Sequence, residues 1–244
     1  TTTINGNDGT DTINVGSNAQ GVLTDRGNNT NGMVDAIAAL LTVNGGTGSD
    51  VLNVDDTGDG NANTGNLTGT GITGLDMAGS ITYGTLETLN IGLGANDDVF
   101  TIASTHGNVT NLYGNNGADV INVRTVAGAT TVNGNAGADT VNVGSNAQGS
   151  LASRAANSNG TVNGISASLT INGDGAGSER DLVTVDDTAD TANNTGVLTN
   201  STLTGLGMAV GISYGTLEDL VISLGSGADI FTINSTHNSA TAGT

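Results

Sequence analysis

The stretch Gly45-Gly46-Thr47-Gly48-Ser49-Asp50-Val51-Leu52-Asn53 decides the fold of this chain. Closely spaced glycines form a tight turn, an aspartate closes it, and apolar residues then alternate with polar ones as in a half-buried strand. Related stretches occur seven times, and each ends its turn at an aspartate: Asp11, Asp50, Asp98, Asp119, Asp139, Asp181 and Asp229. A turn repeated this often predicts a repeating structure rather than an ordinary globular core.

The residues around each aspartate follow one register. The second and fourth residues after it are apolar in every copy, as a strand with one buried face requires. These pairs are Ile13/Val15, Leu52/Val54, Phe100/Ile102, Ile121/Val123, Val141/Val143, Val183/Val185 and Phe231/Ile233. The residues between them are Asn or Thr, which we expect to bond to one another along the stack. Each copy is therefore predicted to be a strand, a tight turn and a second strand.

The spacing of the turns predicts the architecture. Gaps near one or two multiples of about 20 to 24 residues fit the circumference of a stacked β-coil. We therefore expect an all-β fold, a parallel β-helix or β-roll solenoid of about 11–12 coils of roughly 20–24 residues. A longer repeat is also present, because Val15-Gly16-Ser17-Asn18-Ala19-Gln20-Gly21 returns unchanged at Val143 to Gly149. It divides one continuous solenoid into a first unit, 1–129, and an incomplete second unit, 130–244.

One segment of each long unit is ambiguous. Residues 33–41 resemble a short helix, whereas the equivalent residues 161–169 contain Ser and Gly and favour a strand. We predict strand for both.

The composition restricts the partners. There are 23 acidic residues against four arginines and no lysine, which gives a net charge of −19. Such a charge repels nucleic acid and anionic lipid, and it opposes compaction unless cations neutralise it. There is no cysteine and no apolar run of transmembrane length. We expect divalent cations as cofactors, and we expect neither nucleic-acid binding nor membrane insertion.

The nonapeptide resembles the RTX family of calcium-binding β-rolls, whose pattern is Gly-Gly-x-Gly-x-Asp-x-apolar-x. Gly45 to Asn53 matches it fully, and three copies replace the second glycine with asparagine, which tolerates the same left-handed backbone. The resemblance implies that turn carbonyls and aspartates coordinate Ca²⁺. The ligands it implies are Asp11, Asp50, Asp98, Asp119, Asp139 and Asp229, whereas Asp181 follows an insertion after Gly173. Family nonapeptides run in tandem, whereas these are single, so a ladder along one edge is expected.

A second acidic cluster occurs once in each long unit. It consists of Asp55, Asp56 and Asp59 in the first unit and of Asp186, Asp187 and Asp190 in the second. Three carboxylates within five residues repel one another unless water or a metal ion separates them. Both readings, a calcium site and a solvated loop, remain open.

The long unit also resembles modules of very large bacterial β-strand-repeat surface proteins. We therefore expect a calcium-stabilised structural module of a secreted cell-surface protein, adhesin stalk or fibre, in an extracellular and bacterial setting. Expected partners are neighbouring repeats or further copies stacked end to end, and surface polysaccharide. The alternatives are a β-helix enzyme acting on acidic polysaccharide and an ice-binding solenoid. We predict no enzyme, since His106, His237, Glu87 and Glu218 form no paired catalytic set in the sequence and no arginine pairs with a repeated acidic turn; the arginines are Arg26, Arg124, Arg154 and Arg180.

Overall fold

The chain forms two sheets of ten strands each. The computed structural model describes residues 1–21, 30–173 and 179–238, and these contain no helix. In spatial order the first sheet holds β1 (Thr2–Gly9), β3 (Leu41–Gly48), β7 (Ile81–Gly84), β6 (Gly71–Gly74), β5 (Thr64–Thr68), β9 (Val99–Ile102), β11 (Val120–Val123), β13 (Thr140–Val143), β15 (Leu182–Asp186) and β19 (Asp219–Ser223). The second holds β2 (Thr12–Val15), β4 (Val51–Asp55), β8 (Thr88–Gly92), β10 (Val109–Tyr113), β12 (Thr130–Asn133), β14 (Leu169–Asn172), β18 (Ile212–Gly215), β17 (Thr202–Gly205), β16 (Thr195–Leu198) and β20 (Ile230–Ile233).

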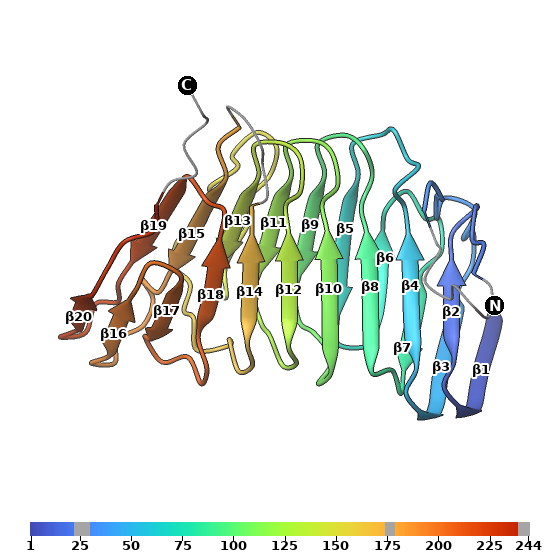
Figure 1. The fold of residues 1–244 in the computed structure, drawn as a ribbon, viewed down its shortest axis with the longest axis horizontal. Helices are drawn as coiled ribbons and strands as arrows, with labels where there is room; N and C mark the ends of the chain where they lie inside the picture. Colours follow the sequence, from blue (N-terminus) through green and yellow to red (C-terminus); the bar gives the residue numbers. More distant parts are fainter. Residues whose placement is uncertain (22–29, 174–178, 239–244) are drawn as a thin grey trace.

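The two sheets lie one behind the other, and the chain passes back and forth between them (Figure 1). It leaves the first sheet at one edge, which we call edge one, and returns from the second sheet at the opposite edge, edge two. Edge two is at the top of Figure 1, where loops from β8, β10 and β12 arch over to the strands behind. The all-β prediction is confirmed, and two mostly parallel sheets are consistent with a solenoid.

The number of coils differs from the prediction. Within the described residues, one strand of each sheet in succession makes a rung, and there are eight rungs rather than eleven or twelve. Asp11 and Asp50 are 39 residues apart, and Asp139 and Asp181 are 42 apart, yet each pair lies on adjacent rungs. Long loops and hairpins occupy the extra residues, so a double gap does not hold a second rung.

A hairpin interrupts the parallel order once in each long unit. Strands β5 and β6 pair antiparallel and are inserted between β7 and β9 in the first sheet. The equivalent strands β16 and β17 are inserted in the second sheet, between β18 and β20. The hairpin changes sheets because the chain crosses between the sheets an odd number of times from β1 to β12.

The core lies between the sheets and follows the predicted register. Of the fourteen apolar residues predicted to face inward, eleven are buried, including Leu52, Phe100 and Ile121. The exceptions are Ile13, Phe231 and Ile233, which belong to the two terminal rungs. The outward Asn and Thr bonds are also present, for example from Asn53 Nδ2 to Asn14 Oδ1 (2.7 Å), from Asn142 Nδ2 to Asn122 Oδ1 (3.2 Å) and from Thr184 Oγ1 to Asn142 Oδ1 (2.8 Å).

The strand prediction for residues 33–41 and 161–169 is wrong over most of both segments. β3 begins only at Leu41 and β14 only at Leu169, and the preceding residues form irregular loops. The loop backbone bonds to carboxylates instead of a neighbouring strand: Gly32 N donates to Asp55 Oδ2 (2.8 Å) and Val34 N to Asp56 Oδ1 (3.0 Å). These bonds bring the loop against the acidic cluster.

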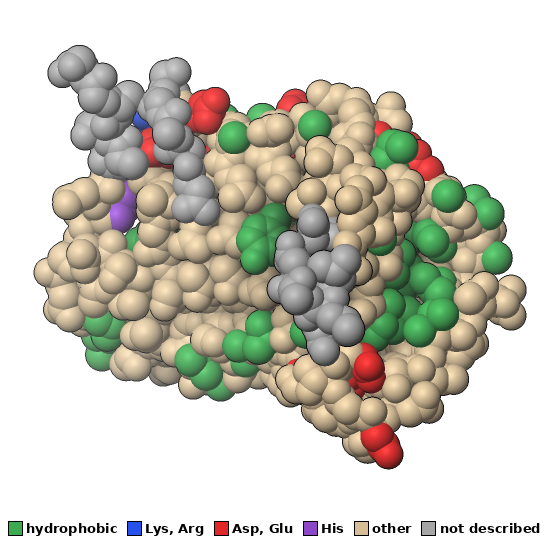
Figure 2. Space-filling model, turned by 45° about the vertical axis from the view of Figure 1, so that its right-hand side comes forward, with side chains coloured by type: hydrophobic (Ala, Val, Ile, Leu, Met, Phe, Trp, Pro, Cys, Tyr) green, Lys and Arg blue, Asp and Glu red, His purple; other side chains and the backbone are tan. Residues whose placement is uncertain are grey.

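Both ends of the stack expose apolar side chains. Figure 2 shows hydrophobic side chains gathered at the end that carries the first rungs, where Ile4 is 41% exposed. At the other end, Ile233 on the inner face of β20 is 62% exposed, and Ile230 on its outer face is 66% exposed. The inner face of each terminal rung therefore lacks the cover that interior rungs receive from their neighbours.

Candidate metal centre

Each nonapeptide forms the tight turn that its sequence predicts. In the turn before Asp119, Asn115 has φ 71° and Gly117 has φ 112°, so both adopt backbone conformations with positive φ. Asn7 and Asn135 occupy the same position with φ near this value, 69° and 70°. The expectation that asparagine replaces glycine here is therefore confirmed. The turn carries the chain from one sheet to the other and leaves the aspartate at the edge.

On edge two, five acidic side chains are stacked on consecutive rungs; we call this the long ladder. Each accepts, through one oxygen, the backbone N–H of the residue one rung before it. The donor–acceptor pairs are Asn63 to Asp98 (2.6 Å), Asp98 to Asp119 (2.8 Å), Asp119 to Asp139 (2.7 Å), Asp139 to Asp181 (2.8 Å) and Asp181 to Glu218 (2.8 Å). Glu218, which the sequence did not mark as part of a site, ends this ladder.

Edge one carries a shorter ladder. Asp11 N donates to Asp50 Oδ1 (2.9 Å), and Asp50 N donates to Glu87 Oε2 (2.7 Å). Asp229 lies on the same edge, where it accepts the N–H of Asn194 (2.9 Å). The expectation of a single shared edge is therefore wrong for the full set of aspartates, although Asp98, Asp119 and Asp139 do share one edge. The chain crosses between the sheets an odd number of times in one long unit. Equivalent turns of the next unit therefore lie on the opposite edge.

The second carboxylate oxygen of the ladder residues is the chemically unusual feature. In Asp11, Asp50, Asp119 and Asp139 this Oδ2 is buried and accepts no hydrogen bond. A Cβ built on Gly114 would lie 2.5 Å from Asp119 Oδ2 and 2.5 Å from the carbonyl oxygen of Gly134. Only glycine fits there, and it leaves a carboxylate oxygen and a carbonyl oxygen facing one small space.

Burial changes the acidity of these groups. Burial, reinforced by the negative charges of Asp139 and Asp98, raises the pKa of Asp119 to about 8. Burial and the charge of Asp181 raise the pKa of Asp139 to about 7, and burial raises that of Asp98 to about 6. A buried carboxylate without a donor is satisfied by a proton or by a cation. The ladders can therefore exchange one for the other.

The acidic cluster of the first long unit adjoins the start of the long ladder. Asp55 ties down neighbouring loops, because Gly32 N reaches its Oδ2 and Thr57 Oγ1 reaches its Oδ1 (2.6 Å). Asp56 and Asp59 are also buried, and both accept from Asn63 Nδ2, at 3.3 and 2.7 Å. The backbone of the same Asn63 donates to Asp98, so the cluster and the ladder meet at this residue.

Asp35 completes this group, and the sequence analysis missed it. One oxygen each of Asp35, Asp56 and Asp59 lies within 4.8 Å of the other two, so these residues could hold a metal ion. Burial, with the charges of Asp59, Asp35 and Asp98, raises the pKa of Asp56 to about 7. We call Asp35, Asp55, Asp56, Asp59 and Asn63 the first acidic corner. Asp35 lies in the irregular 33–40 loop, so no regular spacing connects it to the others.

The second long unit has an equivalent second acidic corner: Asn163, Asp186, Asp187, Asp190 and Asn194. Asp186 again anchors a loop, accepting from Gly160 N (2.6 Å) and Thr188 Oγ1 (2.7 Å). Burial raises the pKa of Asp187 to about 6, whereas the backbone N–H of Ala192 lowers that of Asp190. Calcium binding at Asp55 and Asp186 stays a prediction, and both already accept several hydrogen bonds.

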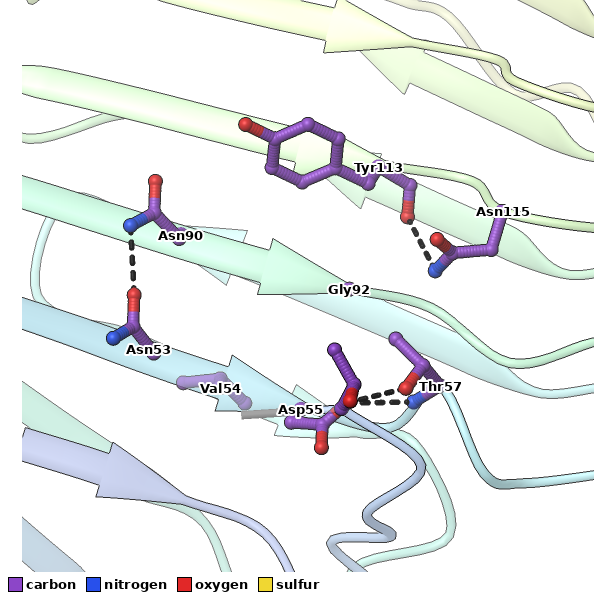
Figure 3. A pocket seen from close by; sticks show the side chains of 9 residues that line it. Asn53, Val54, Asp55, Thr57, Asn90, Gly92, Tyr113 and Asn115 are labelled. Atoms are coloured by element: carbon purple, nitrogen blue, oxygen red, sulfur yellow. Dashed lines mark hydrogen bonds between the residues drawn. The ribbon is translucent and has the colours of Figure 1, made fainter. Parts of the chain in front are cut away.

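A groove crosses the outer face of the second sheet beside the first acidic corner (Figure 3). Its lining includes Tyr113, the Asn53–Asn90 amide pair (2.7 Å) and Asp55. No arginine is among the lining residues, although the alternative enzyme would need one to bind sugar carboxylates. Arg26 lies outside the described residues.

The histidines occupy equivalent structural positions. The ring of His106 lies edge-on to Tyr83 at 5.8 Å between centroids, and that of His237 lies edge-on to Tyr214 at 6.4 Å. The expectation that no arginine pairs with a repeated turn is wrong for Arg154. It donates to the carbonyl oxygens of Asp119 (2.7 Å) and Ala138 (3.0 Å), so it supports the backbone of the long ladder. The prediction that the chain is not an enzyme stays a prediction.

Among the described residues, no helix has the length and apolar character needed to cross a bilayer. No protein-family model, curated protein or solved structure matches the chain.

Proposed function

We propose that this chain is a calcium-stabilised structural module of a secreted cell-surface protein, an adhesin stalk or a fibre. The observation that carries the proposal is the row of buried Oδ2 atoms, exemplified by Asp50, Asp119 and Asp139, that face no hydrogen-bond donor. An architectural element repeats one kind of site along its length. An enzyme concentrates its chemistry at one place.

The donor chemistry favours calcium. The oxygens that line the ladders come from carboxylates and from turn carbonyls such as that of Gly134, and hard cations such as Ca²⁺ prefer oxygen ligands. Adjacent rungs lie about 4.8 Å apart, so charged carboxylates on successive rungs repel one another. Cations between them would remove that repulsion and, with it, much of the effect of a net charge of −19.

A calcium requirement would also explain an extracellular location. Extracellular calcium modules bind with dissociation constants of about 0.1–1 mM. Inside a cell the sites would stay empty and the anionic chain would be easier to keep unfolded for export. Outside, calcium would fill the sites and join the rungs, because metal binding to a folded site stabilises that fold.

The exposed ends support a role in assembly. The apolar side chains of Ile4, Ile230 and Ile233 lie on terminal rungs, where another rung of the same kind would cover them. We therefore propose that the terminal rungs stack end to end on neighbouring repeats or on further copies of the chain. Surface polysaccharide is a further proposed partner, for which the groove beside Tyr113 offers an aromatic ring and amide groups.

The test is thermal unfolding followed by circular dichroism in EDTA, in excess Ca²⁺ and in excess Mg²⁺. We expect Ca²⁺ to raise the melting temperature by about 10 °C or more, because each filled site adds about 2–3 kcal/mol at 100 times its dissociation constant. Mg²⁺ should act more weakly, since it demands tighter octahedral geometry. Identical melting curves in EDTA and in Ca²⁺ would exclude the proposal.

A variant pair ties the effect to the ladder. Asp119→Asn keeps an oxygen for the N–H of Asp98 but replaces the unpaired Oδ2 with an amide nitrogen. It should therefore reduce the rise in melting temperature that Ca²⁺ causes. Asp76→Asn is the matched control, because Asp76 is exposed, lies outside both ladders and has φ 52°, which asparagine tolerates. If both variants lose the same part of the calcium-induced rise in melting temperature, the ladder is not the source of that rise.

A further inference from the structure

The two acidic corners differ at one ligand position. We propose that Asp35, Asp56, Asp59 and Asn63 form a binding site for a hard divalent cation of the calcium class, and that the second long unit lacks this site. The site would hold an ion away from the repeated turns and join three chain segments. It depends on the proposed function only for the choice of calcium.

The geometry fits one ion. Oxygens of Asp35, Asp56 and Asp59 lie within 4.8 Å of one another. Ca²⁺ binds oxygens at about 2.3–2.6 Å, so two oxygens on opposite sides of one ion lie about 5 Å apart. Asp56 and Asp59 are 0% and 2% exposed, whereas Asp35 is exposed on the loop that covers them. An ion at this point would therefore have a path from solvent and a buried set of ligands.

Asn63 provides an independent indication of a ligand. Its side chain is 3% exposed, and its Nδ2 donates to the carboxylates of both Asp56 and Asp59. Its Oδ1 is buried and has no hydrogen-bond partner. Because Nδ2 faces both carboxylates, a half-turn of the amide would bring this unpaired oxygen, which costs about 1–3 kcal/mol while nothing binds it, to the same position. Amide oxygens are ordinary ligands of Ca²⁺, so a cation would satisfy this atom together with the carboxylates.

In the second corner two amide groups donate to one carboxylate, that of Asp190. The residue equivalent to Asp35 is Asn163, whose Nδ2 donates to Asp190 Oδ2 (3.2 Å). Asn194 Nδ2 donates to the same oxygen (2.9 Å). One amide therefore replaces one carboxylate, and a neutral hydrogen-bond donor stands where the first corner has a third negative charge. The loss of one charged ligand weakens any cation site.

A bound ion would cross-link the loop that precedes β3 to two other segments of the chain. Asp35 belongs to this loop, Asp56 and Asp59 belong to the connection that follows β4, and Asn63 precedes β5 and pairs with Asp98 on the long ladder. A bound ion would hold the loop against the edge of the stack. In the second unit the amide of Asn163 bonds directly to Asp190 instead.

The experiment counts ions bound to the 244-residue chain and to two reciprocal variants. Asp35→Asn copies the second corner into the first, and Asn163→Asp copies the first corner into the second. Each protein is dialysed against Ca²⁺ over a concentration series, and bound metal is measured by mass spectrometry. We expect Asp35→Asn to bind about one ion fewer than the parent chain and Asn163→Asp about one ion more.

The outcomes separate this site from the ladders. If Asp35→Asn binds as many ions as the parent chain with the same affinity, the inference is overturned while the proposed function stands. If the parent chain binds no calcium, both fail. Should Asp35→Asn fold poorly, as judged by circular dichroism, Asn163→Asp decides alone: one additional ion supports the site, and an unchanged count overturns it.

Discussion

The two acidic corners share their backbone bonds and differ in what balances their charge. In both corners the first aspartate accepts an N–H of the covering loop, the second accepts the N–H two residues further along it, and an asparagine N–H donates to an aspartate at the edge of the stack. The matching bonds are Gly32–Asp55 and Gly160–Asp186 (2.8 and 2.6 Å), Val34–Asp56 and Val162–Asp187 (3.0 and 3.1 Å), and Asn63–Asp98 and Asn194–Asp229 (2.6 and 2.9 Å).

The charge balance changes because Asp35 stands where the second corner has Asn163. A single position, a carboxylate at Asp35 and an amide at Asn163, therefore changes the charge of the whole cluster. An amide nitrogen supplies a hydrogen bond from within the chain, whereas a carboxylate oxygen requires a proton or an ion from outside. We therefore expect the first corner to bind a cation and the second corner to need none.

The largest expected effect is the response of the metal-free chain to pH. The pKa of Asp56 is raised from 3.8 to about 7 and that of Asp187 to about 6, and Asp119 in the long ladder reaches about 8. A raised carboxyl pKa means that the folded state binds the proton more tightly. Its stabilising effect is complete below pH 3.8 and is lost as the pH rises through the folded-state value.

In EDTA we therefore expect the melting temperature to fall by on the order of 10 °C between pH 5 and pH 8. Carboxyl NMR shifts should show Asp56 titrating at a higher pH than Asp187. A melting temperature that rises over this range would contradict the assignment, and coincident titration of Asp56 and Asp187 would remove the difference between the corners.

The next effect concerns the asparagine of each corner. Asn63 is buried and donates to two carboxylates, whereas Asn194 is half-buried and donates to one. In EDTA, Asn63→Ala should cost about 2–3 kcal/mol of unfolding free energy and Asn194→Ala about 1 kcal/mol, since hydrogen bonds to buried charged groups contribute more. Urea denaturation measures both. Equal costs would show that burial does not distinguish the two corners.

The smallest expected effect is the change in melting temperature caused by Asp35→Asn. It is the most specific test, because the sign of this change should depend on calcium. In EDTA, Asp35→Asn removes a negative charge beside Asp56 and adds a donor, so we expect the melting temperature to rise by about 1–3 °C. In saturating Ca²⁺ the same variant should melt below the parent chain, because it loses a ligand. A change of the same sign under both conditions would contradict a cation at the first corner.

The sequence predicts the parts of the molecule that depend on local periodicity. Phe100 and Ile102 are fully buried because alternation with a period of two fixes which face of a strand meets the core. Ile233 has the same place in the pattern but is exposed, since the last rung has no neighbour to cover it. The stacking of Asp98, Asp119 and Asp139 on adjacent rungs likewise follows from their regular spacing.

The parts that depend on long loops were not predictable. Asp35 reaches Asp56 and Asp59 because an irregular loop is held by Asp55 and Asp56, and no periodic pattern reports such a loop. The rung count was overestimated for a similar reason, since a gap in spacing does not say whether it contains a coil or a loop. The role of Glu87 as a ladder terminus was also hidden, because its longer side chain occupies an aspartate's position on a different turn.

The placement of the hairpins in opposite sheets has a geometric consequence for any longer array of these units. A unit that advances by an odd number of half-turns rotates its successor by 180° about the long axis, so β5–β6 and β16–β17 occupy opposite flanks. A series of such units would follow a twofold screw and present its acidic corners alternately on the two flanks. A filament built in this way would offer matching contacts to neighbours on both sides without any change in its sequence.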